Sequence, residues 1–377
     1  MPVSPDPRPY LVVSASGRAL ARSAARRGIR VVVLDLFNDV DTRALALASR
    51  ACAGRRGRFH RAFLLQAARE LAPTGGYAGL VVGSGLEGRP ALLHALSRQC
   101  ALLGNSPETV VRVKDPEFFF PLLDRLAIPH PEVRMTAPRN PQGWLAKRVG
   151  GAGGAHVRQA HLGWPRKERR YFQRFQAGRV MSALFLADGK RACLVGVNEQ
   201  WTAELTRAAR FAYGGAVTAD DVAEPVRTAA SNAAARLTDT LGLRGLNGLD
   251  FVLAGDAPRV LELNARPTAT LDLYDDAIPG GLFAQHLSAC AGRLGVGIVP
   301  RDSARAHAIV YAACPWRVPL AFDWPEWVTD IPAGGSLIAA GAPVCTVHAQ
   351  GESMRATREV VMARREAMQS RFWEKPA

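Results

Sequence analysis

The sequence predicts a mixed α/β fold in which a parallel sheet precedes a larger region of strands and helices. Over the first hundred residues, short β-branched runs alternate with Ala- and Arg-rich helical segments, and such alternation is typical of parallel sheets with helices on both faces. Further along, strand-like runs surround an Ala-rich helix and end in a pair of adjacent strands. The 377 residues are enough for two or three domains.

The first region, residues 1–105, is expected to hold four strands and three helices. Gly28 follows the first helix, where a glycine commonly ends a helix, and Pro90 stands in the first turn of the third helix. The strands are expected at 10–14, 29–34, 77–82 and 101–104, and the helices at 18–27, 63–71 and 90–100.

The second region, residues 106–295, is expected to begin with two helices and to continue as strands. The turn at 255–258, Gly-Asp-Ala-Pro, has residues typical of a hairpin. Helices are expected at 107–113, 116–126, 228–241 and 281–294, and strands at 144–149, 171–176, 180–187, 191–198, 249–254 and 259–264. The third region, residues 296–377, is expected to be a small C-terminal α+β region with strands at 306–312 and 343–349 and a helix at 355–372.

The composition predicts a soluble, cytoplasmic protein that acts on small molecules. No apolar run reaches the roughly 18–20 residues that span a bilayer, and the N-terminus lacks the order of a signal peptide. The six cysteines form no CxxC pair, so neither a zinc ribbon nor a disulfide framework is expected. The formal charge of +15 is nearly all arginine spread along the chain, which favours a surface attracting anionic substrates. Nucleic-acid binding stays as an alternative that a steep salt dependence would reveal.

The most specific segment is the predicted strand pair within residues 246–267. Residues two apart on a strand face the same side, so Glu262 and Asn264 share a face that Asp250 on the paired strand can join. Three hard oxygen ligands on one surface suit Mg²⁺, which keeps several waters and binds phosphate oxygens. Arg266 adds a planar fork for a phosphate or carboxylate. Acidic residues inside an apolar strand are costly unless they bind something, which favours the metal site over a solvated hairpin.

Two lysines and a glycine loop predict a nucleotide site. Lys147 lies on a predicted strand, from which its side chain can reach nucleotide phosphates, and Lys114 lies near the start of the second region. No GK[ST] follows the loop, so it is not a Walker P-loop, and taken alone it could equally be a mobile surface hairpin. Its backbone N–H groups can fold over phosphates, and the residues concerned are Gly150, Gly151, Gly153 and Gly154.

The order of these features resembles the ATP-grasp superfamily. The resemblance rests on a lysine, a strand lysine, a glycine loop, a hinge and a D…ExN hairpin followed by arginine, and it covers about residues 106–295. A preceding Rossmann-like domain, here residues 1–105, is typical of the family. The resemblance implies ATP and Mg²⁺ as cofactors. It implies that Lys114 and Lys147 bind the nucleotide and that Arg266 acts with Lys147 in catalysis. It implies that Mg²⁺ is held by Asp250, Glu262 and Asn264. It also implies that the hinge that contacts adenine includes Gln173, Arg174 and Phe175.

Residues 102–133 resemble a branch of predicted ATP-dependent carboligases related to biotin carboxylase, which is associated with the biosynthesis of tetrahydromethanopterin- and methanofuran-type coenzymes. The first metal ligand is an aspartate, as in D-alanine–D-alanine ligases, whereas biotin carboxylases have glutamate there. This favours a carboxylate–amine ligase that forms an amide through an acyl phosphate. A bicarbonate-activating carboxylase and a non-catalytic nucleotide-binding protein stay as alternatives, and the identity of the carboxylate and the amine stays open.

Two loops at the carboxyl edge of the predicted parallel sheet are candidates for the substrate side. The first contains Ser16 and Arg18, and the second contains Ser84 and Glu87. The second loop, residues 83–88, formally matches GxGxxG, but a dinucleotide fingerprint belongs at the first βα turn rather than after a third strand. We therefore expect it to face the cleft and to contact a substrate. Among oligomeric states, a homodimer is the default expectation.

Overall fold

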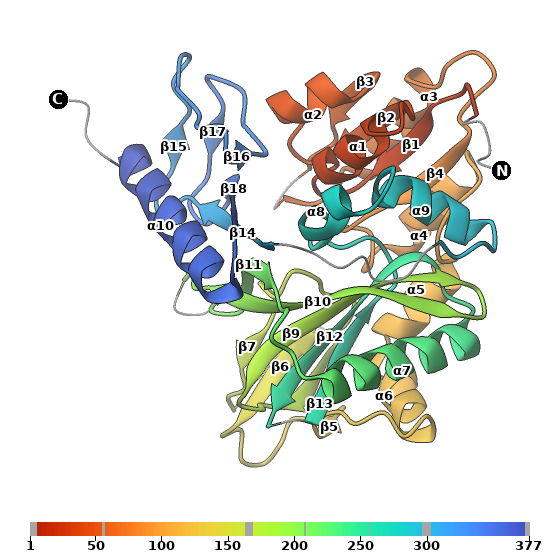
Figure 1. Ribbon diagram of the computed structural model, residues 1–377, viewed down its shortest axis with the longest axis vertical. Helices are drawn as coiled ribbons and strands as arrows, with labels where there is room; N and C mark the ends of the chain where they lie inside the picture. The colour runs from red at the N-terminus through yellow and green to blue at the C-terminus, as the bar shows by residue number, and fades with distance from the viewer. Residues whose placement is uncertain are drawn as a thin grey trace.

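The computed structural model describes residues 6–54, 57–162, 169–206, 209–255, 257–295 and 303–373. A parallel sheet lies beside a large antiparallel sheet, so the predicted mixed α/β fold is confirmed (Figure 1). Asp256 in the predicted hairpin turn and the predicted boundary at residue 296 lie outside the described residues. No helix within the described ranges is long and apolar enough to cross a membrane.

The N-terminal part forms a four-stranded parallel sheet in the order β3-β2-β1-β4. Every residue of β2 is buried, as expected for a strand that is covered on both faces. The strands are β1 (Tyr10–Val13), β2 (Val31–Asp35), β3 (Ala48–Ala51) and β4 (Gly79–Val82), and the helices are α1 (Arg18–Ala25), α2 (Val40–Leu45), α3 (Arg61–Glu70) and α4 (Pro90–Ser97).

Two elements of this part were missed in the sequence analysis, and one predicted strand was wrong. The edge strand β3 and the short helix α2 were not expected, because Ala-Ser-Arg-Ala is half-buried throughout and shows no alternation of apolar and polar residues. Residues 101–104, expected as a strand, contribute only a single bridge between Leu102 and Leu80. The fourth strand of the sheet is therefore β3, and residues 101–104 lie beside β4 at the other edge.

An eight-stranded sheet, ordered β13-β12-β9-β10-β11-β14-β18-β16, forms the body of the molecule. Strands from the expected C-terminal region extend this sheet through the pairing of β11 with β14, so the third region shares its backbone hydrogen bonds with the second. β11 was not expected, because its two adjacent glycines weaken the strand pattern. The strands are β9 (Arg179–Asp188), β10 (Ala192–Ala203), β11 (Ala212–Thr218), β12 (Arg244–Ala254), β13 (Ala257–Asn264), β14 (Ala304–Tyr311), β16 (Val328–Thr329) and β18 (Pro343–Gly351).

Helices cover both faces of this sheet. Helix α7 (Glu224–Leu241) packs on one face and ends at Gly242, whose φ of 65° suits glycine. On the other face, α9 (Gly281–Cys290) and the short α8 (Leu271–Tyr274) and η2 (Asp275–Ala277) pack between the sheet and α1. Helix α10 (Met354–Trp373) lies along β14 and β18 (Figure 1).

A smaller sheet, β5-β8-β6-β7, lies in the same part of the molecule as β9, β12 and β13 of the large one (Figure 1). It follows two capped helices. Ser106 accepts a hydrogen bond from the Thr109 amide at the start of the first, and Asp115 accepts one from the Glu117 amide at the start of the second. These elements are α5 (Pro107–Lys114), α6 (Pro116–Arg125), β5 (Val133–Arg134), β6 (Trp144–Arg148), β7 (Arg158–Gln159) and β8 (Arg170–Arg174), and a separate two-stranded sheet pairs β15 (Trp316–Arg317) with β17 (Leu337–Ile338).

Candidate functional site

The three residues predicted as metal ligands lie together on paired strands. Asp250 of β12 is the register partner of Glu262 on β13. The Asn264 side-chain amide donates to Asp250 Oδ2 over 2.9 Å and to Glu262 Oε1 over 3.4 Å. Among the described residues, no group of three or more His, Cys, Asp or Glu side chains is arranged to hold a metal ion. Two carboxylates and one amide therefore form the donor set, which fits an ion such as Mg²⁺ that takes its remaining ligands from water and phosphate.

Lys114 lies at the C-terminal end of α5 and reaches this cluster. Its Nζ donates to Glu262 Oε2 over 3.2 Å and to Asn264 Oδ1 over 3.0 Å, and its side chain is only 7% exposed. Gln200 of β10 also joins the cluster, because its amide nitrogen lies 3.4 Å from Asp250 Oδ1. The sequence analysis did not single out Gln200, because it ended this strand at residue 198.

Lys147 lies on β6 as the register partner of Tyr171 on β8, and it is buried. Within the described ranges, no hydrogen bond or ion pair involves its ammonium group. Burial lowers the pKa of Lys147, and the nearby carboxylates of Glu262 and Asp250 oppose this shift. Lys147 is therefore a buried lysine beside two carboxylates, with no direct partner for its ammonium group among the described residues.

The two carboxylates of the cluster have opposite pKa shifts. Burial, followed by the charge of Glu262, raises the pKa of Asp250 to about 7. Burial also disfavours the charged form of Glu262, but Lys114 and Lys147 outweigh it and hold the pKa of Glu262 below its usual range. Crowding of like charges next to two lysines is the arrangement that a divalent cation relieves.

The glycine loop between β6 and β7 lies between two other segments. A Cβ atom at Gly88 would lie 2.8 Å from the Gly150 carbonyl oxygen, so the loop at 83–88 packs directly against it. On the other side, the Tyr213 amide of β11 donates to the Gly153 carbonyl over 3.1 Å. A Cβ atom at Gly154, whose φ is 72°, would overlap the carbonyl of Phe211. Close approach on both sides, together with positive φ, explains why this loop needs glycine. The remaining predicted glycine of the loop, Gly151, lies against the ring of His156.

The predicted adenine hinge lies at the end of β8. The backbone amides of Arg174 and Phe175 donate to the carbonyls of Glu132 and Gly143, each over 2.8 Å, so these two amides are not available to a ligand. The Gln173 side chain is 1% exposed, and its amide nitrogen has no hydrogen-bond partner among the described residues. A buried amide without a partner is uncommon, and it distinguishes Gln173 from the other two residues of the predicted hinge.

Arg266 and Glu87 form a buried ion pair that links the N-terminal part to the cluster. The Arg266 Nε donates to Glu87 Oε1, and Arg266 Nη2 lies 3.3 Å from Asn264 Oδ1. The second oxygen of Glu87 accepts the Gly85 amide over 2.7 Å. Burial disfavours the charged form of Glu87, but Arg266 and Lys114 outweigh it and lower the pKa of Glu87. Ser84 lies on the same loop, where its carbonyl accepts the Ala15 amide over 2.8 Å.

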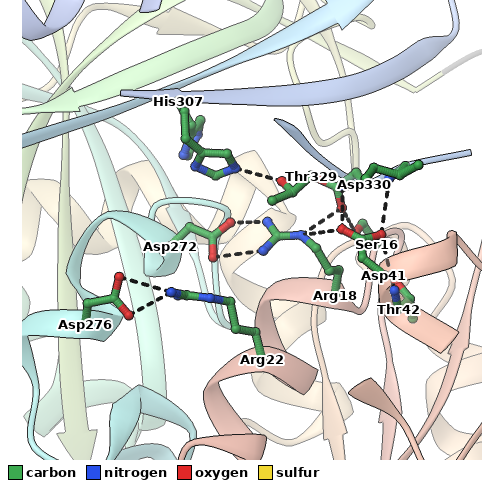
Figure 2. A network of polar contacts seen from close by, with 12 residues as sticks. Ser16, Arg18, Arg22, Asp41, Thr42, Asp272, Asp276, His307, Thr329 and Asp330 are labelled. Atoms are coloured by element: carbon green, nitrogen blue, oxygen red, sulfur yellow. Dashed lines mark hydrogen bonds and ion pairs between the residues drawn. The ribbon is translucent and has the colours of Figure 1, made fainter. Parts of the chain in front are cut away.

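Ser16 and Arg18, also predicted for the substrate side, belong to a different network (Figure 2). Arg18 pairs with Asp272 of α8, and its Nε lies 3.2 Å from Asp330 Oδ1. The Ser16 hydroxyl donates to the same Asp330 oxygen over 2.8 Å. Among the described residues, no hydrogen bond or ion pair joins Ser16 or Arg18 to Lys114 or Glu262. Instead, the network ties α1 to α8 and to the segment after β16.

Comparisons with known proteins concern the fold around this site. Residues 115–270 match the family model described as the ATP-grasp domain. No curated protein sequence matches the chain.

Several solved structures share the fold at low sequence identity. The biotin carboxylase domain dimer of the Hydrogenobacter thermophilus 2-oxoglutarate carboxylase, solved with MgADP and bicarbonate, has a TM-score of 0.70 and 12% identity, over 95% of this chain and 88% of that one. Campylobacter jejuni biotin carboxylase has a TM-score of 0.69 and 13% identity, over 94% and 89%. N5-carboxyaminoimidazole synthase from Aspergillus clavatus, solved with ADP and 5-aminoimidazole ribonucleotide, has a TM-score of 0.69 and 12% identity, over 97% and 99%. Residues 115–270 therefore match an ATP-grasp domain, and the fold of the chain is similar to that of biotin carboxylase.

Proposed function

We propose that this chain is an ATP-dependent ligase that joins a carboxylate to an amine through an acyl phosphate. The observation that carries the proposal is the cluster of Asp250, Glu262 and Asn264 beside Lys114 and the buried Lys147, whose ammonium group has no partner in the part of the chain that the structure describes. Oxygen donors for a cation and positive charge for phosphates meet there beneath the glycine loop. Phosphoryl transfer needs this combination of positioning and charge stabilisation.

The cluster residues have distinct roles in the proposed reaction. Asp250, Glu262 and Asn264 would hold Mg²⁺, which when bound neutralises charge on the transferring phosphoryl group. Lys114 and Lys147 neutralise the remaining phosphate charge. A substrate carboxylate attacks the γ-phosphorus of ATP and ADP leaves. The amine then attacks the acyl carbon, phosphate leaves with the bonding electrons, and the nitrogen releases one proton to phosphate or solvent.

The residues around the cluster support both steps. Arg266, held in place by Glu87, is positioned to stabilise the charge that builds on the acyl phosphate. The glycine loop, packed between Gly88 and the Tyr213 amide, excludes water from that intermediate. Gln173 supplies a side-chain amide for the adenine base.

A bicarbonate-activating carboxylase is the second candidate. The similar structures favour it, since they include biotin carboxylases and N5-carboxyaminoimidazole synthase. The aspartate at position 250 favours the ligase, because it is the residue that D-alanine–D-alanine ligases have at the first metal position. The two reactions share every cluster residue and differ in the acid that is activated, so turnover decides between them.

The test is phosphate release from Mg-ATP with a panel of carboxylate and amine pairs, including precursors of tetrahydromethanopterin- and methanofuran-type coenzymes. Wild type is compared with Glu262→Gln and with the matched control Glu359→Gln, whose carboxylate is 67% exposed on α10. We expect turnover that needs both an acid and an amine, is lost in Glu262→Gln and is retained in Glu359→Gln. Turnover with bicarbonate in place of the acid would identify the carboxylase, and nucleotide binding without any turnover would identify a non-catalytic protein.

A further inference from the structure

A second cavity, outside the candidate nucleotide site, lies where α1 and η2 meet the far end of the large sheet. Its volume is about 330 Å³, within the range of about 300–1,000 Å³ that is typical of small-molecule sites. Arg18 lies on its wall but is neutralised by Asp272 and Asp330. The charge of the cavity therefore depends on three other arginines of its wall, none of which has a role in the reaction as proposed: Arg22 of α1, Arg305 of β14 and Arg364 of α10.

The cavity and the metal cluster lie on the same face of the large sheet. Register partners on neighbouring strands point to the same side, and a row of such partners crosses the sheet through Asp250, Ser182, Asn198 and Thr218. The Thr218 hydroxyl accepts the Arg305 amide over 3.1 Å. Four strand spacings of about 4.8 Å separate Asp250 from Arg305, so the two sites lie roughly 19 Å apart along the sheet. The cavity is therefore a separate site and not an extension of the cluster.

One carboxylate of the wall, Asp276, is shared by several arginines. Arg22 Nη2 donates to both of its oxygens, over 2.9 and 3.1 Å (Figure 2). Arg305 Nη1 donates to the same carboxylate, and Arg26 of α1 lies 3.8 Å from it. The wall has one further carboxylate beyond this network, the exposed Glu326. Arg22, Arg305 and Arg364 therefore face two carboxylates, which leaves an excess of positive charge.

Arg364 has no carboxylate partner in the part of the chain that the structure describes. Its Nη1 donates to the His348 carbonyl, and its guanidinium carbon lies 5.1 Å from the centre of the Trp327 ring. Burial lowers the pKa of Arg364, as expected for a cation without a counter-charge. Because an arginine in a protein stays protonated, this half-buried guanidinium is a positive charge that a bound anion would balance.

The three arginines also have unused donors that open into the cavity. In the contacts among the described residues each guanidinium uses one nitrogen, which is Nη2 in Arg22 and Nη1 in Arg305 and Arg364. The other two nitrogens of each have no partner within these residues, and none of them is buried. A pair of guanidinium nitrogens matches the two oxygens of a carboxylate or phosphate, so accessible forks of this kind suit an anionic ligand.

We propose that this cavity binds a small molecule through a carboxylate or phosphate group that Arg22, Arg305 and Arg364 hold. The inference goes beyond the proposed function and does not depend on it, because it requires no nucleotide in the cluster. The bound group joins α1 to β14 and α10, which belong to opposite ends of the chain. A ligand that binds only the folded protein also stabilises it, so the anion should raise the unfolding temperature.

The experiment titrates the full chain, without nucleotide, with inorganic phosphate and separately with succinate at constant ionic strength, and measures binding by calorimetry. We expect at least one of the two anions to bind. Arg364→Met and Arg305→Met should each weaken that binding about tenfold or more, the effect of losing one hydrogen bond to a charged group. Lys147→Met, which changes the nucleotide site, should keep it. The matched control Arg355→Met, which removes a fully exposed arginine of the same helix α10, should bind like wild type.

Arg364→Lys separates charge from geometry. Lysine keeps the positive charge but lacks the planar pair of donors, so it should recover only part of the affinity that Arg364→Met loses. Circular dichroism verifies that each variant is folded. Because Arg305 and Arg364 lie on different elements, one of the two methionine variants still tests the proposal if the other does not fold.

Three outcomes would overturn the inference and leave the proposed function standing. The first is that wild type binds neither anion. The second is that binding is lost in Lys147→Met but kept in Arg364→Met and Arg305→Met, which would place the anion in the nucleotide site. The third is that Arg355→Met weakens binding as much as Arg364→Met, which would mean that the anion responds only to the overall positive charge of the protein.

Discussion

Replacing Arg18 by methionine should lower the free energy of unfolding by about 3–5 kcal/mol, the cost of removing one partner from a buried ion pair. The Arg18 side chain is 4% exposed, and those of Asp272 and Asp330 are 7% and 18% exposed. Methionine fills most of the volume of the arginine stem but leaves these carboxylates without their cation. The free energy of unfolding is measured by urea denaturation at pH 7, and the transition is monitored by tryptophan fluorescence and by circular dichroism.

The pH dependence of this loss has a defined sign. Burial disfavours the charged form of Asp272, but Arg18 outweighs it and holds the pKa of Asp272 well below its usual range. A depressed pKa contributes stability that is present above the unfolded value of about 3.9 and is lost as the pH falls toward the folded value. Because the variant lacks this contribution, the difference in free energy of unfolding between wild type and Arg18→Met should decrease as the pH falls below about 4.

Two further variants make the test specific. Arg22 lies one turn along α1 and pairs with Asp276, but it is 39% exposed, so Arg22→Met should cost only about 0–1 kcal/mol. Adding Asp272→Asn to Arg18→Met should recover part of the loss, because it removes a buried charge that has no partner. The reasoning would be refuted if Arg18→Met and Arg22→Met lowered the free energy of unfolding equally. It would also be refuted if the decrease caused by Arg18→Met did not change with pH.

Two other predictions concern the glycine loop and the thiols. Gly153 and Gly154 have similar φ values, 69° and 72°, but only a Cβ atom at Gly154 would overlap the Phe211 carbonyl, since Gly153 faces open space. Gly154→Ala should therefore weaken Mg-ATP binding by calorimetry about tenfold more than Gly153→Ala, and equal effects would contradict the closed loop. Cys314 is exposed, whereas Cys345 is buried and burial raises its pKa, so a disulfide reagent should modify Cys314 in the fast phase and Cys345 only on unfolding. A fast phase that persists in Cys314→Ser would contradict this assignment.

The candidate metal and nucleotide site was accessible from sequence because its residues are related by local geometry. Glu262 and Asn264 are two apart on one strand, and a short turn sets the register that brings Asp250 opposite Glu262. Lys147 was predicted because it precedes a glycine loop on an apolar strand. In each case the spacing along the chain fixes the direction of the side chain, so periodicity alone places the groups on one face.

The sequence by itself therefore determined the α/β class, most of the helices and strands, and which polar residues share a face. Tertiary structure alone decided the contacts between distant segments. Gln200 reaches Asp250 although β9 lies between their strands, Glu87 pairs with Arg266 across 179 positions, and Arg18 pairs with Asp272 across 254. The physical reason is that a local pattern sets the direction of a side chain relative to its own strand or helix. Its partner is set by how separate elements pack, which depends on the whole core.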